Sequence, residues 1–181
     1  MVIVVDTREK PRAIVKILDE FRRHGVEVVR RALNFADYLR PDRPGIVIDR
    51  KQNLSEVASN CVQERKRFVR EIERCNKAGS HLIVLVEHGG KIRQLTDVIG
   101  WKNPRLRESP YAVSGERLFR IMKAMESYYG IEWQFCDKRN TGKRIIEILE
   151  GEDRYAGRGS AGLCGDMEHI QRVPVEADEA G

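Results

Sequence analysis

The side chains best suited to chemistry stand at the end of one short apolar run, residues 45–51, which reads Gly-Ile-Val-Ile-Asp-Arg-Lys. The run predicts a short strand, and side chains on a strand alternate between its two faces. Asp49 and Lys51 therefore share one face, and Arg50 lies on the other. A buried carboxylate is costly unless it binds a metal ion or pairs with a cation. A metal held by such an acid can activate water, and a neighbouring lysine can assist hydrolysis.

A solvated ion pair at a strand end would explain the same residues, because most surface charge pairs contribute little. Other acids in the first fifty residues favour the metal site. Asp6 and Glu9 follow the apolar run 2–5, and Asp37 precedes the turn-rich residues 41–45. Each alone has a simpler explanation, such as a strand end for Asp6 or an Asx turn for Asp37. Together they supply what Mg²⁺ requires, which is one or two carboxylates beside water and substrate phosphate.

Four short motifs follow one another in order: Val5-Asp6-Thr7-Arg8-Glu9, Ala36-Asp37-Tyr38, Ile48-Asp49-Arg50-Lys51 and Arg67-Phe68. In order and spacing they resemble the nuclease domain of the XPF-type structure-specific endonucleases, which belong to the PD-(D/E)xK superfamily. The run 82–87 resembles the next core strand of that family. The resemblance covers residues 2–150 and looks closest to short, single-domain versions such as those carried by bacteriophages.

The resemblance implies a PD-(D/E)xK, restriction-endonuclease-like α/β fold with a mixed central sheet flanked by helices. It also implies cleavage of branched or flapped DNA with Mg²⁺ or Mn²⁺ as the cofactor. The implied roles are metal ligation by Asp37 and Asp49, support from Asp6 and Glu9, catalysis by Lys51, and DNA contact or bracing of the acids by Arg8, Arg50 and Arg67. Relatives often pair through this domain, so a homodimer is an open alternative, and the sequence alone does not decide the oligomeric state. A bacteriophage-type protein would act in the host-cell cytoplasm.

Three positions depart from the family pattern. Ala36 replaces a glycine, which is harmless if the backbone there has a negative φ. Asp49 replaces a glutamate, and the wider superfamily accepts either acid. Ser55 stands where the family has an aspartate, which puts a second metal position in doubt. The tandem helix-hairpin-helix domain of many relatives has no counterpart after Leu149.

The elements that must position these residues alternate between strands and helices, which predicts an α/β fold in residues 1–150. Asn53 is expected to cap one long helix, with Glu56 as its capping-box partner. Thr141 opens the last helix, either as a plain cap or as a phosphate site at a helix N-terminus. The expected strands are 2–5, 26–33, 45–51, 82–86 and 131–135, and the expected helices are 13–21, 54–79, 115–129 and a short one from 141.

Charge is distributed unevenly along the chain, whose formal net charge is +5. Residues 151–181 hold seven acids and three arginines, a net of −4, so the first 150 residues carry +9. A basic folded part favours a polyanionic partner, most simply a nucleic acid.

The expected phosphate contacts lie on one helix face, at Arg65, Lys66, Arg67 and Arg70. Ordinary solvation, with Arg67 pairing Glu71 four residues on, would explain that face equally well. The acidic tail lacks an apolar period and is expected to be disordered.

The remaining composition narrows the class of protein. The four cysteines are far apart, so neither a zinc site nor a disulfide framework is expected, and a cytoplasmic protein is the default. No expected helix combines a basic face with a strong apolar one, which argues against a membrane partner. Two alternatives to a branched-DNA endonuclease stay open: an inactive nuclease-fold scaffold that binds DNA, and a resolvase of four-way junctions. The complete acid set favours an enzyme.

Overall fold

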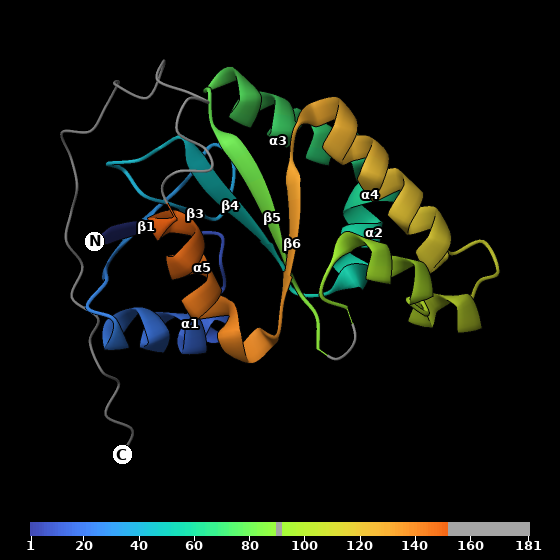
Figure 1. Cartoon of the computed structure of the whole chain (residues 1–181), viewed down its shortest axis with the longest axis horizontal. Coiled ribbons are helices and arrows are strands. Elements are labelled where there is room, and N and C mark those ends of the chain that lie inside the picture. Colours follow the sequence, from blue (N-terminus) through green and yellow to red (C-terminus); the bar gives the residue numbers. More distant parts are fainter. Residues whose placement is uncertain (90–91, 152–181) are drawn as a thin grey trace.

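Six strands form one mixed sheet in the order β2-β1-β3-β4-β5-β6, with helices on both faces (Figure 1). The structure is a computed structural model that describes residues 1–89 and 92–151. The strands are β1 (Val2–Asp6), β2 (Glu27–Arg31), β3 (Tyr38–Leu39), β4 (Ile46–Lys51), β5 (His81–Glu87) and β6 (Glu132–Cys136). The helices are α1 (Pro11–Arg23), α2 (Leu54–Val62), α3 (Arg65–Lys77), α4 (Gly115–Tyr129) and α5 (Thr141–Glu150), with 3₁₀ turns η1 (Leu95–Gly100), η2 (Pro104–Arg107) and η3 (Lys138–Asn140).

The short strand β3 gives the sheet its mixed character. It runs antiparallel to both neighbours, β1 and β4, whereas β1–β2 and β4–β5–β6 pair in parallel. Strand β5 is the only described strand buried at every residue, as its wholly apolar centre indicates. The predicted α/β fold with a mixed, helix-flanked sheet is confirmed.

Two apolar clusters fill the space on either side of the sheet. Helices α1 and α5 cover one face, where Ile14, Phe21 and Ile145 pack on Ile48 and Ile83. Helices α2, α3 and α4 cover the other face, where their buried side chains pack on a second set of strand residues, Val47, Val84 and Val86. Alternate residues of β4 therefore point into different layers. This alternation places Asp49 and Lys51 in the layer of α2 and α3, and Arg50 in the layer of α1 and α5.

The predicted long helix 54–79 is two helices, α2 and α3, separated at Gln63 and Glu64. No glycine or proline marks the break, which is why the sequence predicted a continuous helix. Asn53 caps α2 as expected, since its side chain accepts the Glu56 N–H at 2.9 Å. The Glu56 carboxylate, however, returns to the N–H of Gln52 rather than to that of Asn53.

Smaller differences concern element ends. The predicted strand 26–33 is shorter, and the last strand lies one residue further along. The expected tail, residues 151–181, lies outside the described residues except for Gly151. Within the described part of the chain, no helix has the length and apolarity needed to cross a bilayer. Cys61, Cys75 and Cys136 are free thiols.

Thr141 does not act as a plain cap of α5, because it is the first residue of the helix and Asn140 is at the cap position. Thr141 is fully buried, and its hydroxyl donates to Glu87 Oε1 at 3.0 Å. Gly142 lies directly against α1, where an added Cβ would be 2.7 Å from Glu20 Cβ and 3.2 Å from Ile17 Cα. The Thr-Gly pair therefore serves the close packing of α5 on α1 and the bond to Glu87.

Gly142→Ala should lower the free energy of unfolding by about 1–3 kcal/mol, because the methyl group overfills the α1–α5 contact. Urea denaturation measures the change. Gly100→Ala is the matched control, since a Cβ there meets nothing within 4 Å. Equal stability of the two variants would show that α5 can move away from α1 without cost.

Candidate active site

Three aspartates lie side by side in one row across β1, β3 and β4. Strand pairing matches Val5 with Tyr38 and Tyr38 with Ile48. One residue further, Asp6 N–H donates to the Asp37 carbonyl at 2.8 Å, and Asp37 N–H donates to the Ile48 carbonyl at 2.8 Å. Asp6, Asp37 and Asp49 therefore occupy neighbouring positions on the same face of the sheet. Like charges this close must be balanced by cations or hydrogen bonds.

Asp49 and Lys51 form a buried ion pair on this face. Their exposed fractions are 2% and 8%. Lys51 Nζ donates to Asp49 Oδ1 at 2.9 Å and lies 2.7 Å from Oδ2. The ammonium also stands 5.3 Å from the centre of the Phe68 ring. Burial alone would lower the pKa of Lys51, but the charges of Asp49 and Asp37 raise it above its usual value. The lysine is therefore an ammonium at neutral pH.

Asp37 contributes a second carboxylate to the same place. Its Oδ2 accepts the backbone N–H of Arg50 at 2.8 Å, which fixes the side chain beside the end of β4. Burial raises the pKa of Asp37 well above its usual range, and the charge of Asp49 adds to the shift, against the opposing effect of Lys51. A carboxylate that is unfavourable in its ionised form is prepared to accept a cation.

Asp6 holds neighbouring chain segments together. It accepts the Arg8 N–H at 2.6 Å, the Arg8 guanidinium at 2.7 and 3.0 Å, and the Leu33 N–H at 2.9 Å. Burial by itself would raise the pKa of Asp6, but these bonds outweigh it and the pKa is lowered. Arg8 remains half-exposed beside the row. The expected supporting role of Asp6 agrees with this set of contacts.

Glu71 is a carboxylate at the site that sequence reasoning assigned elsewhere. It was expected to pair with Arg67, but Arg67 pairs with Glu64 at 3.0 Å. Glu71 Oε1 instead accepts the Ala36 N–H at 3.2 Å, and burial together with the charge of Asp49 raises its pKa. A signal was present, because Glu71 lies next to Ile72 on the buried stripe of α3.

Arg50 lies in the opposite layer and braces two further carboxylates. Its Nε and Nη2 donate to both oxygens of Glu9 at 3.0 and 2.8 Å, and its Nη1 donates to Glu87 Oε1 at 2.8 Å. The residue is 3% exposed. The expectation that Arg50 contacts DNA does not fit this position, because its guanidinium is enclosed by acids. Glu9 supports β4 from the far face and is not beside Asp49.

Ala36 has a backbone φ of +61°. Alanine in place of glycine was expected to be harmless only at a negative φ, so this expectation is not met. An alanine in the left-handed region is strained by about 1–2 kcal/mol. Two hydrogen bonds stabilise this strained conformation, one from the Ala36 N–H to Glu71 Oε1 and one from the Asp37 N–H to the Ile48 carbonyl. This backbone conformation directs Asp37 toward Asp49.

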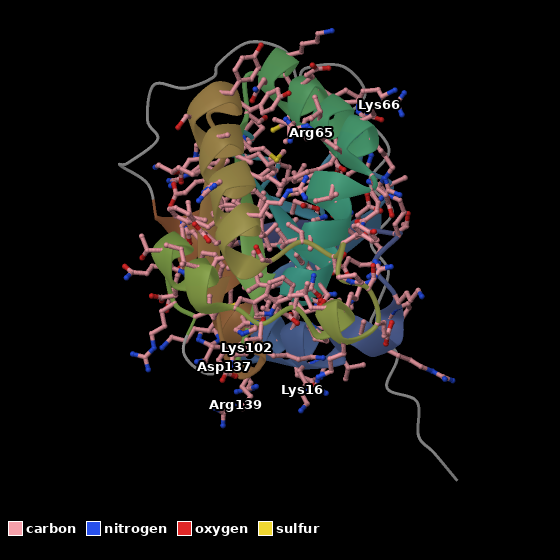
Figure 2. All side chains as sticks on the ribbon, turned by 90° about the vertical axis from the view of Figure 1, so that its right-hand side faces the viewer. Lys16, Arg65, Lys66, Lys102, Asp137 and Arg139 are labelled. Atoms are coloured by element: carbon pink, nitrogen blue, oxygen red, sulfur yellow. The ribbon has the colours of Figure 1, made fainter. Side chains whose placement is uncertain are left out.

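The expected DNA-contact residues on α3, Arg65, Lys66, Arg67 and Arg70, are all exposed. Figure 2 shows Arg65 and Lys66 at the upper end of the molecule in that view, with Lys16, Lys102 and Arg139 at the lower end. Positive side chains therefore lie at both ends.

A comparison with known protein families finds one family model that matches most of this chain. A model of the ERCC4 domain matches residues 5–160. The chain belongs to the ERCC4 domain family. The five residues of the expected catalytic set, Asp6, Glu9, Asp37, Asp49 and Lys51, lie within the matched range.

Solved structures have the same fold as this ERCC4 domain. XPF from Aeropyrum pernix superimposes with a TM-score of 0.59 at 20% identity, covering 85% of this chain and 66% of that one. XPF from Aeropyrum pernix in complex with DNA gives 0.56 at 23% identity, covering 82% and 62%. The chain thus spans about two thirds of the length of these structures or slightly less. Comparison with curated proteins finds no match.

The ERCC4 domain offers a divalent cation a partial ligand set. Among residues 1–89 and 92–151, no three His, Cys, Asp or Glu side chains are arranged to hold a metal by themselves. Mg²⁺ does not require such a cage, because it keeps several waters and takes one or two carboxylates plus substrate phosphate. Asp49 Oδ2 is buried and accepts no hydrogen bond, although the ammonium of Lys51 is near. Asp37 and Asp49 fit such an ion.

Arg50→Ala should destabilise the ERCC4 domain by about 3–5 kcal/mol, because Glu9 and Glu87 would remain buried without a cation. Urea denaturation of the metal-free protein measures the loss. Arg65→Ala, which removes an exposed guanidinium, should change stability by no more than about 0.5 kcal/mol. A stable Arg50→Ala protein that has lost DNA binding would restore the DNA-contact role.

Asp37→Asn should raise the melting temperature of the metal-free protein at about pH 8, because it removes a buried negative charge. In the unfolded chain the carboxyl loses its proton near pH 3.9, at about its ordinary pKa. In the folded chain the Asp37 carboxyl loses its proton at higher pH, because its pKa is raised. The destabilisation by Asp37 therefore grows between the unfolded and the folded pKa and is complete above the folded pKa. The advantage of Asn should therefore vanish toward about pH 4. A lower melting temperature at every pH would contradict the assigned burial of charge.

Proposed function

We propose that this protein is a metal-dependent DNA endonuclease that hydrolyses phosphodiester bonds in branched or junction DNA. The observation that carries the proposal is the buried Asp49–Lys51 pair at the end of β4, with Asp37 beside it in the same row of the sheet. An ion pair in this position costs desolvation that a purely structural strand end would avoid. Membership of the ERCC4 domain family supports the same chemistry.

DNA is the proposed substrate on two grounds. One similar structure, XPF from Aeropyrum pernix, is a complex with DNA. The first 150 residues of this chain carry a net charge of +9, as counted from the sequence, which favours a polyanion. Arg8 is half-exposed beside the carboxylate row, and Arg65, Lys66, Arg67 and Arg70 are exposed on α3. These side chains are the proposed phosphate contacts.

Each residue of the site has a distinct proposed task. Asp37 and Asp49 would hold a Mg²⁺ or Mn²⁺ ion, whose chemical contribution when bound is an activated water and compensation of negative charge. Glu71 would hold the backbone before Asp37 through the Ala36 N–H and add negative charge near Asp49. The Asp6 N–H, which donates to the Asp37 carbonyl, and the Ala36 N–H, which donates to Glu71 Oε1, would keep the row in register. Arg50 holds β4 from behind.

Lys51 acts as a donor rather than as a base. Its pKa is raised by the neighbouring carboxylates, so it keeps its proton over the physiological range. An ammonium fixed at a dry site stabilises charge that develops on a phosphate oxygen, without reorganising during the reaction. A cation at Asp37 and Asp49 would compete with Lys51 for Asp49 and direct the ammonium toward the substrate.

Asp49→Asn should abolish both Mn²⁺ binding and cleavage, because it keeps the shape of the side chain and removes the charge that attracts the ion. Lys51→Ala should keep Mn²⁺ binding and slow cleavage by about a hundredfold, on the order of 3 kcal/mol of transition-state stabilisation. Calorimetry with Mn²⁺ and cleavage of labelled flap, fork, four-way and linear DNAs measure both properties on the same preparations.

Both variants should still bind DNA, since the proposed phosphate contacts lie elsewhere. Asp49→Glu should retain part of the activity, because related domains have glutamate there. Full activity of Asp49→Asn would exclude this strand as the reaction centre, and an inactive DNA-binding scaffold would then be the better account. The panel of DNAs also decides between a flap endonuclease and a four-way junction resolvase.

A further inference from the structure

A groove outside the carboxylate row lies between α2 and the segment 103–113. Its volume is about 210 Å³, and its walls include Ser55, Ser59 and Gln63 on one side and Arg105 and Tyr111 on the other. Small-molecule sites usually measure about 300–1,000 Å³ and are mainly apolar. This groove is smaller and combines hydroxyl, amide and guanidinium groups with the apolar side chains of Ala58, Ala112 and Val113, so it suits one unit of a chain that has both a polar and an apolar part.

The groove wall formed by residues 103–113 is held in place by buried contacts. Asn103 is buried, and its side chain donates to the Val113 carbonyl at 2.9 Å and accepts the Arg105 N–H at 3.1 Å. Gly115 fits so closely under η1 that an added Cβ would be 2.5 Å from the carbonyl oxygens of Val98 and Trp101. The segment is thus fixed to the start of α4, and its position opposite α2 is a property of the fold.

Tyr111 presents an aromatic ring to solvent at this groove. It is 91% exposed, the most exposed large apolar or aromatic side chain of the described residues. Tyr128, which is 82% exposed, packs edge-on against Tyr129 with ring centres 4.7 Å apart. An exposed ring beside an arginine is the combination with which proteins bind unpaired nucleotides, by base stacking and phosphate contact.

The groove starts close to the proposed reaction centre. Ser55 lies four residues after Lys51 and is the second residue of α2, which is joined to β4 by two residues only. Ser59 follows on the same face of α2 one turn later. A strand that leaves Asp49 along α2 would pass Ser55 and then meet Arg105 and Tyr111. Figure 1 shows α2 at the lower ends of β4 and β5, with the segment between β5 and α4 beside it.

We propose that this groove binds an unpaired nucleotide of the substrate, next to the bond that is cut. Tyr111 stacks on its base, Arg105 contacts its phosphate, and the hydroxyl groups of Ser55 and Ser59 bond to the chain between them. This inference rests on the proposed DNA substrate and assigns the part of the protein that contacts an unpaired arm of it. It also assigns a positive role to Ser55, where related domains have an acid.

The test compares binding of a fluorescein-labelled fork with two oligo-dT arms and a blunt duplex of the same length, by anisotropy without divalent metal. Tyr111→Ala should weaken binding to the fork by about fivefold or more, because the loss of about 1 kcal/mol of base stacking changes the Kd by that factor. Its preference for the fork over the duplex should fall by the same factor. Tyr111→Phe should restore the preference, and Tyr111→Leu, which is apolar without a ring, should not.

Tyr128→Ala is the matched control, because it removes another exposed tyrosine from the far end of α4. Its fork preference should equal that of the original protein. Arg105→Gln should make the log–log salt dependence of fork binding less steep by about 0.7, the value for one phosphate contact on a single strand.

Three results would overturn the inference. If Tyr111→Ala binds the fork as tightly as the original protein does, the groove holds no nucleotide, although the nuclease proposal stands. If the affinity of Tyr111→Ala for the fork and for the duplex falls by the same factor, Tyr111 serves duplex binding or folding. The melting temperature of the variant distinguishes these two roles. If the original protein binds neither DNA, the proposed function fails together with the groove.

Discussion

The placement of like charges across three adjacent strands is the constraint on which the rest of the structure depends. Asp6, Asp37 and Asp49 occupy one row because β3 is inserted antiparallel between β1 and β4. Each carboxylate has a different compensation. Arg8 and backbone N–H groups satisfy Asp6, and the pKa of Asp6 is lowered. Lys51 donates to one oxygen of Asp49 and leaves the other without a hydrogen bond, and the pKa of Asp37 is raised because its charge is only partly compensated. The imbalance is concentrated between Asp37 and Asp49, which is where a cation would relieve it.

Successive side chains of strand β4 point to opposite faces of the sheet, so the charged groups of the proposed reaction centre are separated from the charged group that braces the sheet. Asp49 and Lys51 face α2 and α3, while Arg50 between them faces α1 and α5 and binds two carboxylates there. The Arg50 network also includes Thr141 at the start of α5 through Glu87. A short Asp-Arg-Lys sequence therefore fixes the sheet on one side and presents chemical groups on the other. Rigid support of this kind is what a preorganised site requires.

Much of this arrangement could be predicted from the sequence, because strand alternation and motif order are local properties. The faces of Asp49 and Lys51 and the α/β order of elements follow from them. The helix break at Gln63 carries no glycine or proline, so it depends on tertiary packing. The roles of Glu71 and Ala36 depend on a contact between residues 35 positions apart, and neither the positive φ nor the acceptor can be read from one segment. The sequence left Arg50 between DNA contact and bracing of the acids, because its charge is visible in the sequence and its partners, Glu9 and Glu87, are not.

The central claim is that the partly compensated pair Asp37 and Asp49 is a cation site adjacent to Lys51. It is tested most directly by anomalous X-ray diffraction from crystals of the protein soaked with Mn²⁺. The account predicts one Mn²⁺ within about 2.2 Å of a carboxylate oxygen of each aspartate, with Lys51 displaced from Asp49 Oδ2 and the remaining positions filled by water. An ion bound elsewhere, or no ion at millimolar Mn²⁺ with the Lys51–Asp49 pair intact, would contradict it.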